Sequence, residues 1–179
     1  RRRSWRTRVA GAGSVARDVV VLDPHGGPQA RRRNQIMDAA KHGFAEAGYH
    51  GASINAIIER AGIARGTFYL YFESKSAVFS SILDQAMGDL RARIHRIDVE
   101  SKHVPPPQVQ LRTQLVATLE YIVSDRPLAM LLLSAGHTPD AEAAERLDQF
   151  FAEARDLLRR AFESGMEIGL VRTVEPPLA

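Results

Sequence analysis

The chain has 179 residues, of which 45% are hydrophobic, and it contains no cysteine. This length allows one substantial core or two small ones, and the hydrophobic share is normal for a soluble globular protein. The lack of cysteine excludes disulfides, thiolate metal sites and cysteine nucleophiles. No apolar run approaches the roughly 20 residues that a membrane helix needs, so we expect a soluble protein.

Positive charge is concentrated at the start of the chain. The formal net charge is +3, but residues 1–33 hold nine arginines and two aspartates, a charge of +7, and the remainder carries −4. Such a basic segment fits a polyanion such as nucleic acid, and it equally fits a solvated tail without a specific partner. A twin-arginine or secretory signal does not fit, because no apolar stretch of the usual ~7–15 residues follows the arginines.

The first thirty residues differ from the rest of the chain. Residues 1–30 contain scattered Gly, Pro and Arg without sustained periodicity, so we interpret them as a basic extension. From Arg31 onward, apolar residues recur at spacings of three or four, which predicts a helix with one apolar face. Gly48 is expected to stop this helix.

Two short helices are predicted next. Ser53 is a good N-cap for a helix that ends at Gly62, and a third helix follows over residues 64–70. Small and apolar residues flank the glycine between them, which is the sequence form of a helix-turn-helix. In this motif the first helix braces against the DNA backbone, and the second presents its N-terminal residues to base edges in the major groove.

Longer helices are predicted beyond residue 72. Ser74 can cap a helix whose apolar stripe reaches Ile97, and three prolines at 105–107 end that segment. A further helix is marked by Leu111, Leu115, Leu119 and Ile122. After Pro127 and a short apolar piece comes a last helix, whose inward residues are expected to be Ala143, Leu147, Phe150, Phe151, Ala154, Leu158, Ala161 and Phe162.

The pattern as a whole indicates an all-α fold. No segment alternates convincingly with period two, so we expect no sheet. The final residues 176–179, Pro-Pro-Leu-Ala, look like the opening turn of another helix. We therefore expect that the sequence is truncated or that further residues follow Ala179.

The segment GYHGASINAIIERAGIARGTFYLYFESKS, residues 48–76, closely resembles the DNA-binding signature of the TetR family of bacterial transcriptional regulators. The similarity covers about residues 34–80. It implies an N-terminal three-helix DNA-binding domain at 31–76 and a helical-bundle ligand-binding and dimerisation domain at 77–179. The positions that carry it are Gly48-Tyr49, Ser53, Ile57, Ala61-Gly62-Ile63, Gly66-Thr67-Phe68-Tyr69, Tyr71-Phe72 and Ser74-Lys75.

The resemblance implies base contacts near the start of the third helix. Arg65 can reach O6 and N7 of guanine, and Thr67 can touch a thymine methyl or a phosphate. Gly66 would let the backbone approach the DNA closely, since it has no side chain. Asn55, on the preceding helix, is a further candidate for reading a base.

The same resemblance implies phosphate contacts around this helix. Tyr69 and Tyr71 match phosphate-contacting positions, and Lys75 lies in the first turn of the next helix, where a phosphate is also attracted by the helix N-terminus. Ser53 can donate to a phosphate as well as cap its helix. The residues assigned to the core of this small domain are Phe44, Ile57, Ile63, Phe68 and Phe72.

The arginines before the first predicted helix are expected to add affinity. Residues 34–76 hold four basic and four acidic residues, so their charges cancel. Phosphate neutralisation supplies much of the free energy of DNA binding. We therefore expect Arg31, Arg32 and Arg33 to follow the backbone or to enter the minor groove.

The family resemblance also implies partners for the second domain. We expect a homodimer on a pseudo-palindromic DNA operator in the cytoplasm, acting most simply as a repressor, with activation left open. The family's last dimerisation helix is missing from the sequence, so residues 140–163 are expected to carry association. A small hydrophobic effector is expected, with pocket candidates among the polar groups and Met on apolar helices, namely His95, Gln114, Tyr121, Met130 and His137.

Other classes of function find little support in the sequence. We find no HExxH or similar ligand cluster, no Gly-rich phosphate loop and no Ser/His/Asp arrangement, so we expect no metal, no cofactor and no enzymatic activity. The remaining alternative is a non-catalytic helical module that binds another protein through its apolar helices.

Overall fold

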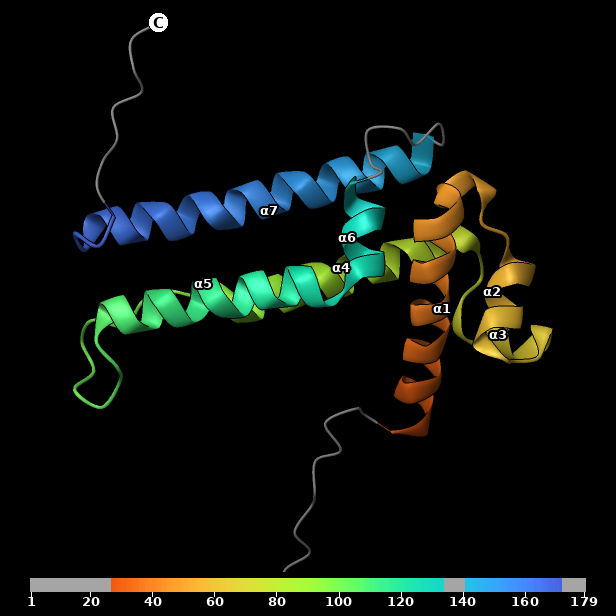
Figure 1. Cartoon of the computed structure of the whole chain (residues 1–179), viewed down its shortest axis with the longest axis horizontal. Helices are drawn as coiled ribbons and strands as arrows, with labels where there is room; N and C mark the ends of the chain where they lie inside the picture. The colour runs from red at the N-terminus through yellow and green to blue at the C-terminus, as the bar shows by residue number, and fades with distance from the viewer. Residues whose placement is uncertain (1–26, 134–140, 172–179) are drawn as a thin grey trace, which may run out of the picture.

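The computed structural model describes residues 27–133 and 141–171. Within these ranges the chain forms helices and no strand, which confirms the predicted all-α fold. None of these helices is both long and apolar enough to cross a membrane. The helices are α1 (Pro28–Gly51), α2 (Ile54–Ala61), α3 (Arg65–Tyr71), α4 (Lys75–Arg93), α5 (Pro107–Ser124), α6 (Arg126–Leu133) and α7 (Ala141–Glu167) (Figure 1).

Helix α1 begins three residues before the predicted start. Pro28 occupies its first turn, where proline fits because its missing N–H would have no partner and its φ is already helical. Arg31, Arg32 and Arg33 therefore lie inside α1, and the prediction that they precede the first helix is wrong. Near the other end, Gly48 has a φ of +70° and interrupts the regular helix, but α1 continues to Gly51, three residues beyond the predicted stop.

The α2–α3 turn follows from its capping residues. The Oγ of Ser53 accepts a hydrogen bond from the N–H of Ala56 at 3.1 Å, which confirms the predicted N-cap. Gly62 ends α2 with a φ of +61°, a left-handed conformation that favours glycine. This allows the chain to turn sharply, so that α3 begins at Arg65 and packs beside α2 at one end of the molecule (Figure 1).

Helices α4, α5 and α7 extend away from this end, and α6 crosses between the bundle and α1 (Figure 1). Ser74 caps α4, as predicted, by accepting from the N–H of Ala77 at 3.1 Å. The helix ends at Arg93, earlier than its apolar stripe suggested, and Ile97 is buried in the connection to α5.

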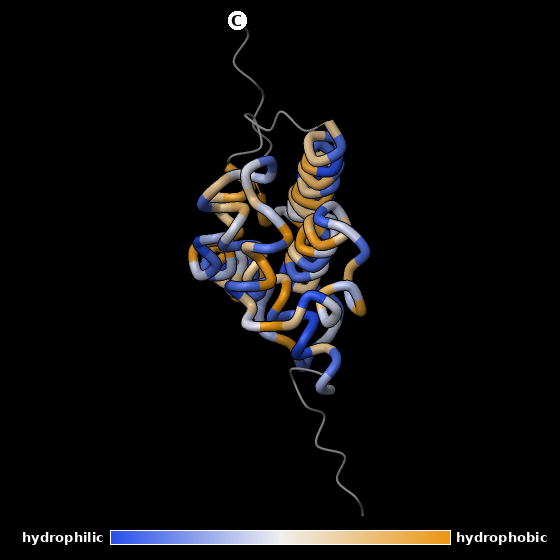
Figure 2. The backbone as a smooth tube through the Cα atoms, turned by 90° about the vertical axis from the view of Figure 1, so that its right-hand side faces the viewer, coloured by the Kyte–Doolittle hydropathy of each residue, from blue (hydrophilic) through white to orange (hydrophobic). Residues whose placement is uncertain are grey.

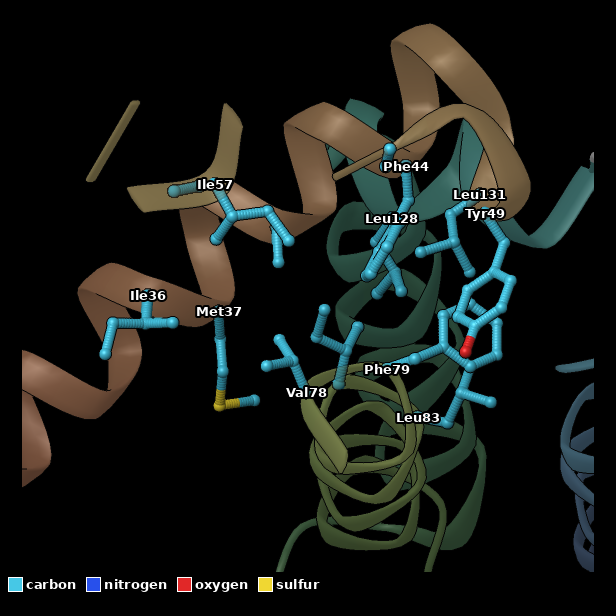
Figure 3. Close-up of a cluster of buried hydrophobic side chains, with 14 of the residues drawn as sticks. Ile36, Met37, Phe44, Tyr49, Ile57, Val78, Phe79, Leu83, Leu128 and Leu131 are labelled. Atoms are coloured by element: carbon cyan, nitrogen blue, oxygen red, sulfur yellow. The ribbon is translucent and has the colours of Figure 1, made fainter. Parts of the chain in front are cut away.

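One hydrophobic cluster joins the helix-turn-helix to the neighbouring part of the bundle. It contains Phe44 of α1 and Phe68 of α3 together with Phe79 of α4 and Leu128 and Leu131 of α6. Figure 3 shows the α6 leucines beside Phe44 and Phe79. A movement of α6 would therefore change the packing of α1, because close-packed interiors transmit displacements.

Helix α5 turns two of its four marking residues, Leu115 and Leu119, away from the bundle, while Leu111 and Ile122 line the cavities inside it. Leu115 and Leu119 are 53% and 61% exposed, and Ile122 is also exposed, whereas Gln114 is only 9% exposed. Helix α7 changes along its length. Its first half buries Ala143, Leu147 and Phe150 as predicted. Leu158 and Ala161 are partly open to solvent but line the cavities of the bundle, whereas Phe162 is exposed and lines neither cavity, so the prediction that it points inward is wrong.

The rest of the surface is mixed in character. Viewed from the end that carries α2 and α3, hydrophilic and hydrophobic residues succeed one another along each helix (Figure 2), as in amphipathic helices that pack on a core. Leu115 and Leu119 of α5 and Phe162 of α7 depart from this pattern, because they are exposed without a covering element among the described residues.

Candidate nucleic-acid interface and ligand cavity

Helix α3 is anchored by one face and exposed on the other. Phe68 is completely buried and its ring contacts that of Phe72. Arg65, Gly66 and Tyr69 are exposed. A short helix held in this way can enter a major groove without losing its core contacts.

The side chain of Arg65 is held in place at the start of α3. Its Nη1 donates a hydrogen bond of 2.7 Å to the Oδ1 of Asn55 on α2, and its guanidinium carbon lies 5.7 Å from the ring centre of Tyr69. All three side chains are exposed. The structure thus brings together two candidate base-reading residues and one candidate phosphate-contacting residue.

The other candidates on the helix-turn-helix differ in their surroundings. Ser53 is exposed and its Oγ serves as the cap, whereas Thr67 and Tyr71 are half-buried, with Tyr71 packed against the core cluster. A Cβ added at Gly66 would meet no atom of the described chain within 4 Å. Packing within the protein therefore does not require glycine there.

Lys75 has protein partners that the sequence did not reveal. Its Nζ donates to the carbonyl oxygens of Tyr49 at 2.7 Å, Ala52 at 3.1 Å and His50 at 3.4 Å, and it lies 4.4 Å from the ring centre of Tyr49. These carbonyls lie at the end of α1 and the start of the connection to α2. Lys75 therefore fixes the corner from which α2 and α3 project.

The three arginines of α1 do not form one group. Arg33 is half-buried, donates to the Oγ of Ser81 at 2.8 Å and lies 5.0 Å from the ring centre of Phe72. Arg32 is exposed and bonds to Gln35 within α1, and Arg31 lines an open groove beside the end of α2. Arg33 therefore ties α1 to α4 and to the end of α3.

Two adjoining cavities lie between α4, α5 and α7. The inner one, of about 230 Å³, is lined mostly by apolar residues of α4 to α7, including Leu132 and Phe150. The outer one, of about 290 Å³, is lined also by polar residues that follow α4, by Gln114 of α5 and by polar residues near the end of α7. Ile94 and Leu157 line both cavities, so the two are neighbours along the bundle.

The predicted pocket residues are distributed unequally over these cavities. His95 and Gln114 line the outer cavity and Tyr121 lines the inner one. Met130 lines neither and is exposed, because the residues of α6 that face the inner cavity are Leu128, Ala129 and Leu132. His137 lies outside the described residues.

Polar groups interrupt the apolar wall on α5. Burial, helped by the neighbouring carboxylate of Asp89, raises the pKa of Tyr121, so its hydroxyl stays protonated and can donate. Thr118 lines the inner cavity, and its Oγ1 is buried without a hydrogen-bond partner in the described structure. The sequence interpretation missed Thr118, although its spacing from Gln114 and Tyr121 places all three on one helix face.

Metal ligation has no candidate in the described ranges, where no three His, Cys, Asp or Glu side chains are grouped to hold an ion. The two regions that could bind a partner are therefore the exposed face of α3 with its neighbours and the cavities of the bundle. The first lies at one end of the molecule and the second along the other helices (Figure 1).

Comparisons with known proteins agree with this arrangement. Residues 36–82 match the tetR family of bacterial regulatory proteins. The chain is 25% identical over 138 residues to the fatty acid metabolism regulator protein of Bacillus subtilis, covering 77% of this chain and 70% of that protein. It is 32% identical over 123 residues to the transcriptional repressor KstR of Rhodococcus jostii, covering 68% and 55%.

A solved structure shares the fold beyond the helix-turn-helix. The regulator FadR of Bacillus subtilis, solved in complex with stearoyl-CoA, superposes with a TM-score of 0.58 at 25% identity, over 80% of this chain and 75% of that one. The chain spans only 31% to 53% of the length of four other curated HTH-type regulators that it matches. The matched helix-turn-helix and the shared helical architecture confirm the resemblance seen in the sequence, and residues 36–82 belong to the tetR family of bacterial regulatory proteins.

Proposed function

We propose that the protein is a transcriptional repressor of the bacterial cytoplasm that binds a palindromic DNA operator as a homodimer and is released by a small-molecule effector. One observation carries the DNA-binding part, namely the exposed helix α3 with the Arg65 guanidinium held between Asn55 and Tyr69. This proposal includes no catalytic step.

The geometry suits recognition of a base edge. An arginine in the major groove reads guanine by donating to O6 and N7 together. Because the guanidinium of Arg65 is already held in place in the free protein, less conformational entropy is lost when DNA binds. Arg65 would read a base while Tyr69, Tyr71, Ser53 and Thr67 contribute contacts to the DNA backbone or a neighbouring base.

A dimer would supply the second half-site that a short recognition helix needs. Exposed apolar residues of α5 and of the second half of α7, such as Leu119 and Phe162, offer a surface for association. Apolar patches of this kind on a folded protein often mark an interface. Phe162 belongs to the segment in which association was predicted.

The effector would bind in the cavities of the bundle. Their inner part is apolar, and the related FadR that was solved with stearoyl-CoA supports an effector with a large apolar part. Lys41 of α1 forms an ion pair with Asp125, with 2.5 Å between Nζ and Oδ2. Leu128 and Tyr121, which line the inner cavity, also border this ion pair. An occupant that displaces α6 would therefore alter how α1 is held.

Binding-site selection from random DNA, followed by gel-shift titration of the enriched sequence, tests the proposal. Wild-type protein should enrich a sequence with two-fold symmetry, and Arg65→Ala should bind it at least about tenfold more weakly. Arg126→Ala, which removes an exposed arginine at the start of α6, is the matched control and should bind like wild type. If no sequence is enriched, or if both variants bind equally well, the proposal is wrong.

A further inference from the structure

Gln114 of α5 has a buried side-chain amide whose N–H group has no hydrogen-bond acceptor among the described residues. Gln114 is 9% exposed, and its Oε1 accepts a hydrogen bond of 3.2 Å from the backbone N–H of His95. Since the oxygen is used in this way, the amide orientation is fixed and the Nε2 group is the donor that remains. Within the described chain, this Nε2 is buried and has no hydrogen-bond partner.

The free donor lies where a ligand could reach it. Gln114 lines the outer cavity of about 290 Å³, and Thr118, one helical turn further along α5, lines the inner cavity of about 230 Å³ and has an unpartnered Oγ1. Each cavity alone is smaller than the roughly 300–1,000 Å³ of typical ligand sites, whereas the two together fall within that range. A single ligand would therefore extend through both.

The two cavities differ in chemistry. The inner one is lined by aliphatic and aromatic side chains, including Leu132, Phe150 and Phe151. The outer one is bordered also by His95, Arg96 and Arg160, and the guanidinium of Arg160 bonds to the carboxylate of Asp156. A ligand that matches both has an apolar tail for the inner cavity and an oxygen-bearing head for the outer one.

We infer that the bundle binds a straight-chain carboxylate or acyl compound whose carboxylate or carbonyl oxygen accepts a hydrogen bond from Gln114 Nε2. This inference rests on the proposed function only in treating the ligand as the effector. A buried donor without a partner costs free energy, and an acceptor on the ligand removes that cost. Thr118 offers a second donor one turn deeper, and the bordering arginines favour a negative charge.

Isothermal titration calorimetry on the full chain without DNA tests the inference, with dodecanoate, dodecanamide and dodecylamine as probes. Dodecanoate and dodecanamide are expected to bind, and dodecylamine, whose ammonium has no acceptor, is expected to bind at least about tenfold more weakly. Gln114→Leu should weaken dodecanoate binding by about tenfold to a hundredfold, as expected for loss of a hydrogen bond to a charged group. Gln108→Leu, the same change at an exposed position of α5, should leave it unchanged.

A second variant covers the case in which Gln114→Leu fails to fold. Gln114→Glu keeps an oxygen for the His95 N–H but replaces the free donor by a carboxylate oxygen, so dodecanoate should lose affinity and dodecylamine should gain it. Equal binding of the three probes, absence of binding, or unchanged dodecanoate affinity in both Gln114 variants would overturn the inference. Because DNA is absent, these results are independent of operator binding, which the DNA selection measures separately.

Discussion

Replacing Lys75 by methionine should loosen the corner that positions the recognition helix. The ammonium donates to three carbonyl oxygens and lies over the Tyr49 ring. A hydrogen bond involving a charged group contributes about 1.5–3 kcal/mol, and a cation–π contact at an exposed site about 0.5–1 kcal/mol. Since Lys75 is half-buried and the freed carbonyls can be hydrated, we expect Lys75→Met to lower the free energy of unfolding by about 2 kcal/mol.

Urea denaturation followed by far-UV circular dichroism measures this loss, and the melting temperature should fall by about 4–8 °C. Lys102→Met is the control, since it makes the same change at an exposed position between α4 and α5 and should stay within about 0.5 kcal/mol of wild type. A Lys75→Met protein as stable as the control would refute the structural role of Lys75. A separate gel-shift series tests the predicted phosphate contact of Lys75. If this contact exists, its loss in Lys75→Met should reduce the salt slope of DNA binding by about one.

Three further variants test other parts of the structure. Asn55→Ala should remove the hydrogen bond that holds Arg65, and it should weaken binding to the selected operator by about fivefold to tenfold without weakening binding to random DNA. Asn34→Ala, the control, should change neither affinity. Competition gel shifts measure both. Burial alone would lower the pKa of Lys41, but hydrogen bonds to its two aspartate partners outweigh that effect and raise the pKa above 10.5. The resulting stabilisation is present below pH 10.5 and is lost as the pH rises through the higher folded-state value, so unfolding midpoints at high pH should fall more in wild type than in Lys41→Met. Phe162→Glu should reduce the mass measured by light scattering from dimer to monomer while leaving the helix content unchanged, and a persistent dimer would exclude this face.

The helix-turn-helix could be predicted almost completely from the sequence, because its signals are local. Ser53 and Ser74 bond to N–H groups three residues ahead, and Gly62 adopts the left-handed conformation that ends a helix. Such interactions depend on a few neighbouring residues, so they are visible in the printed sequence. The start of α1 was misplaced because apolar periodicity begins later than the helix itself.

The site contacts could not be predicted, because they join residues that lie far apart in the sequence. Lys75 reaches carbonyl groups more than twenty residues earlier, and carbonyl groups carry no sequence signal. Arg33 looked like part of a basic arm, yet it packs on Phe72 and bonds to Ser81. Residue type alone does not distinguish an arginine that binds phosphate from one that fastens two helices.

Helix α5 explains why hydrophobic patterning misjudges this half of the molecule. Its leucines at 115 and 119 are exposed, while a glutamine and a threonine without partners for Nε2 and Oγ1 face the interior of the described bundle. In an isolated monomer without a ligand, this arrangement is unfavourable for two reasons. Apolar side chains stay exposed to water, and buried polar atoms lose their hydrogen bonds to water. The arrangement becomes favourable when the outer face meets a second subunit and the inner face meets a ligand. Sequences commonly break the rule of apolar inside and polar outside at functional sites, so this inverted helix marks the surfaces where we propose that the protein binds its partners.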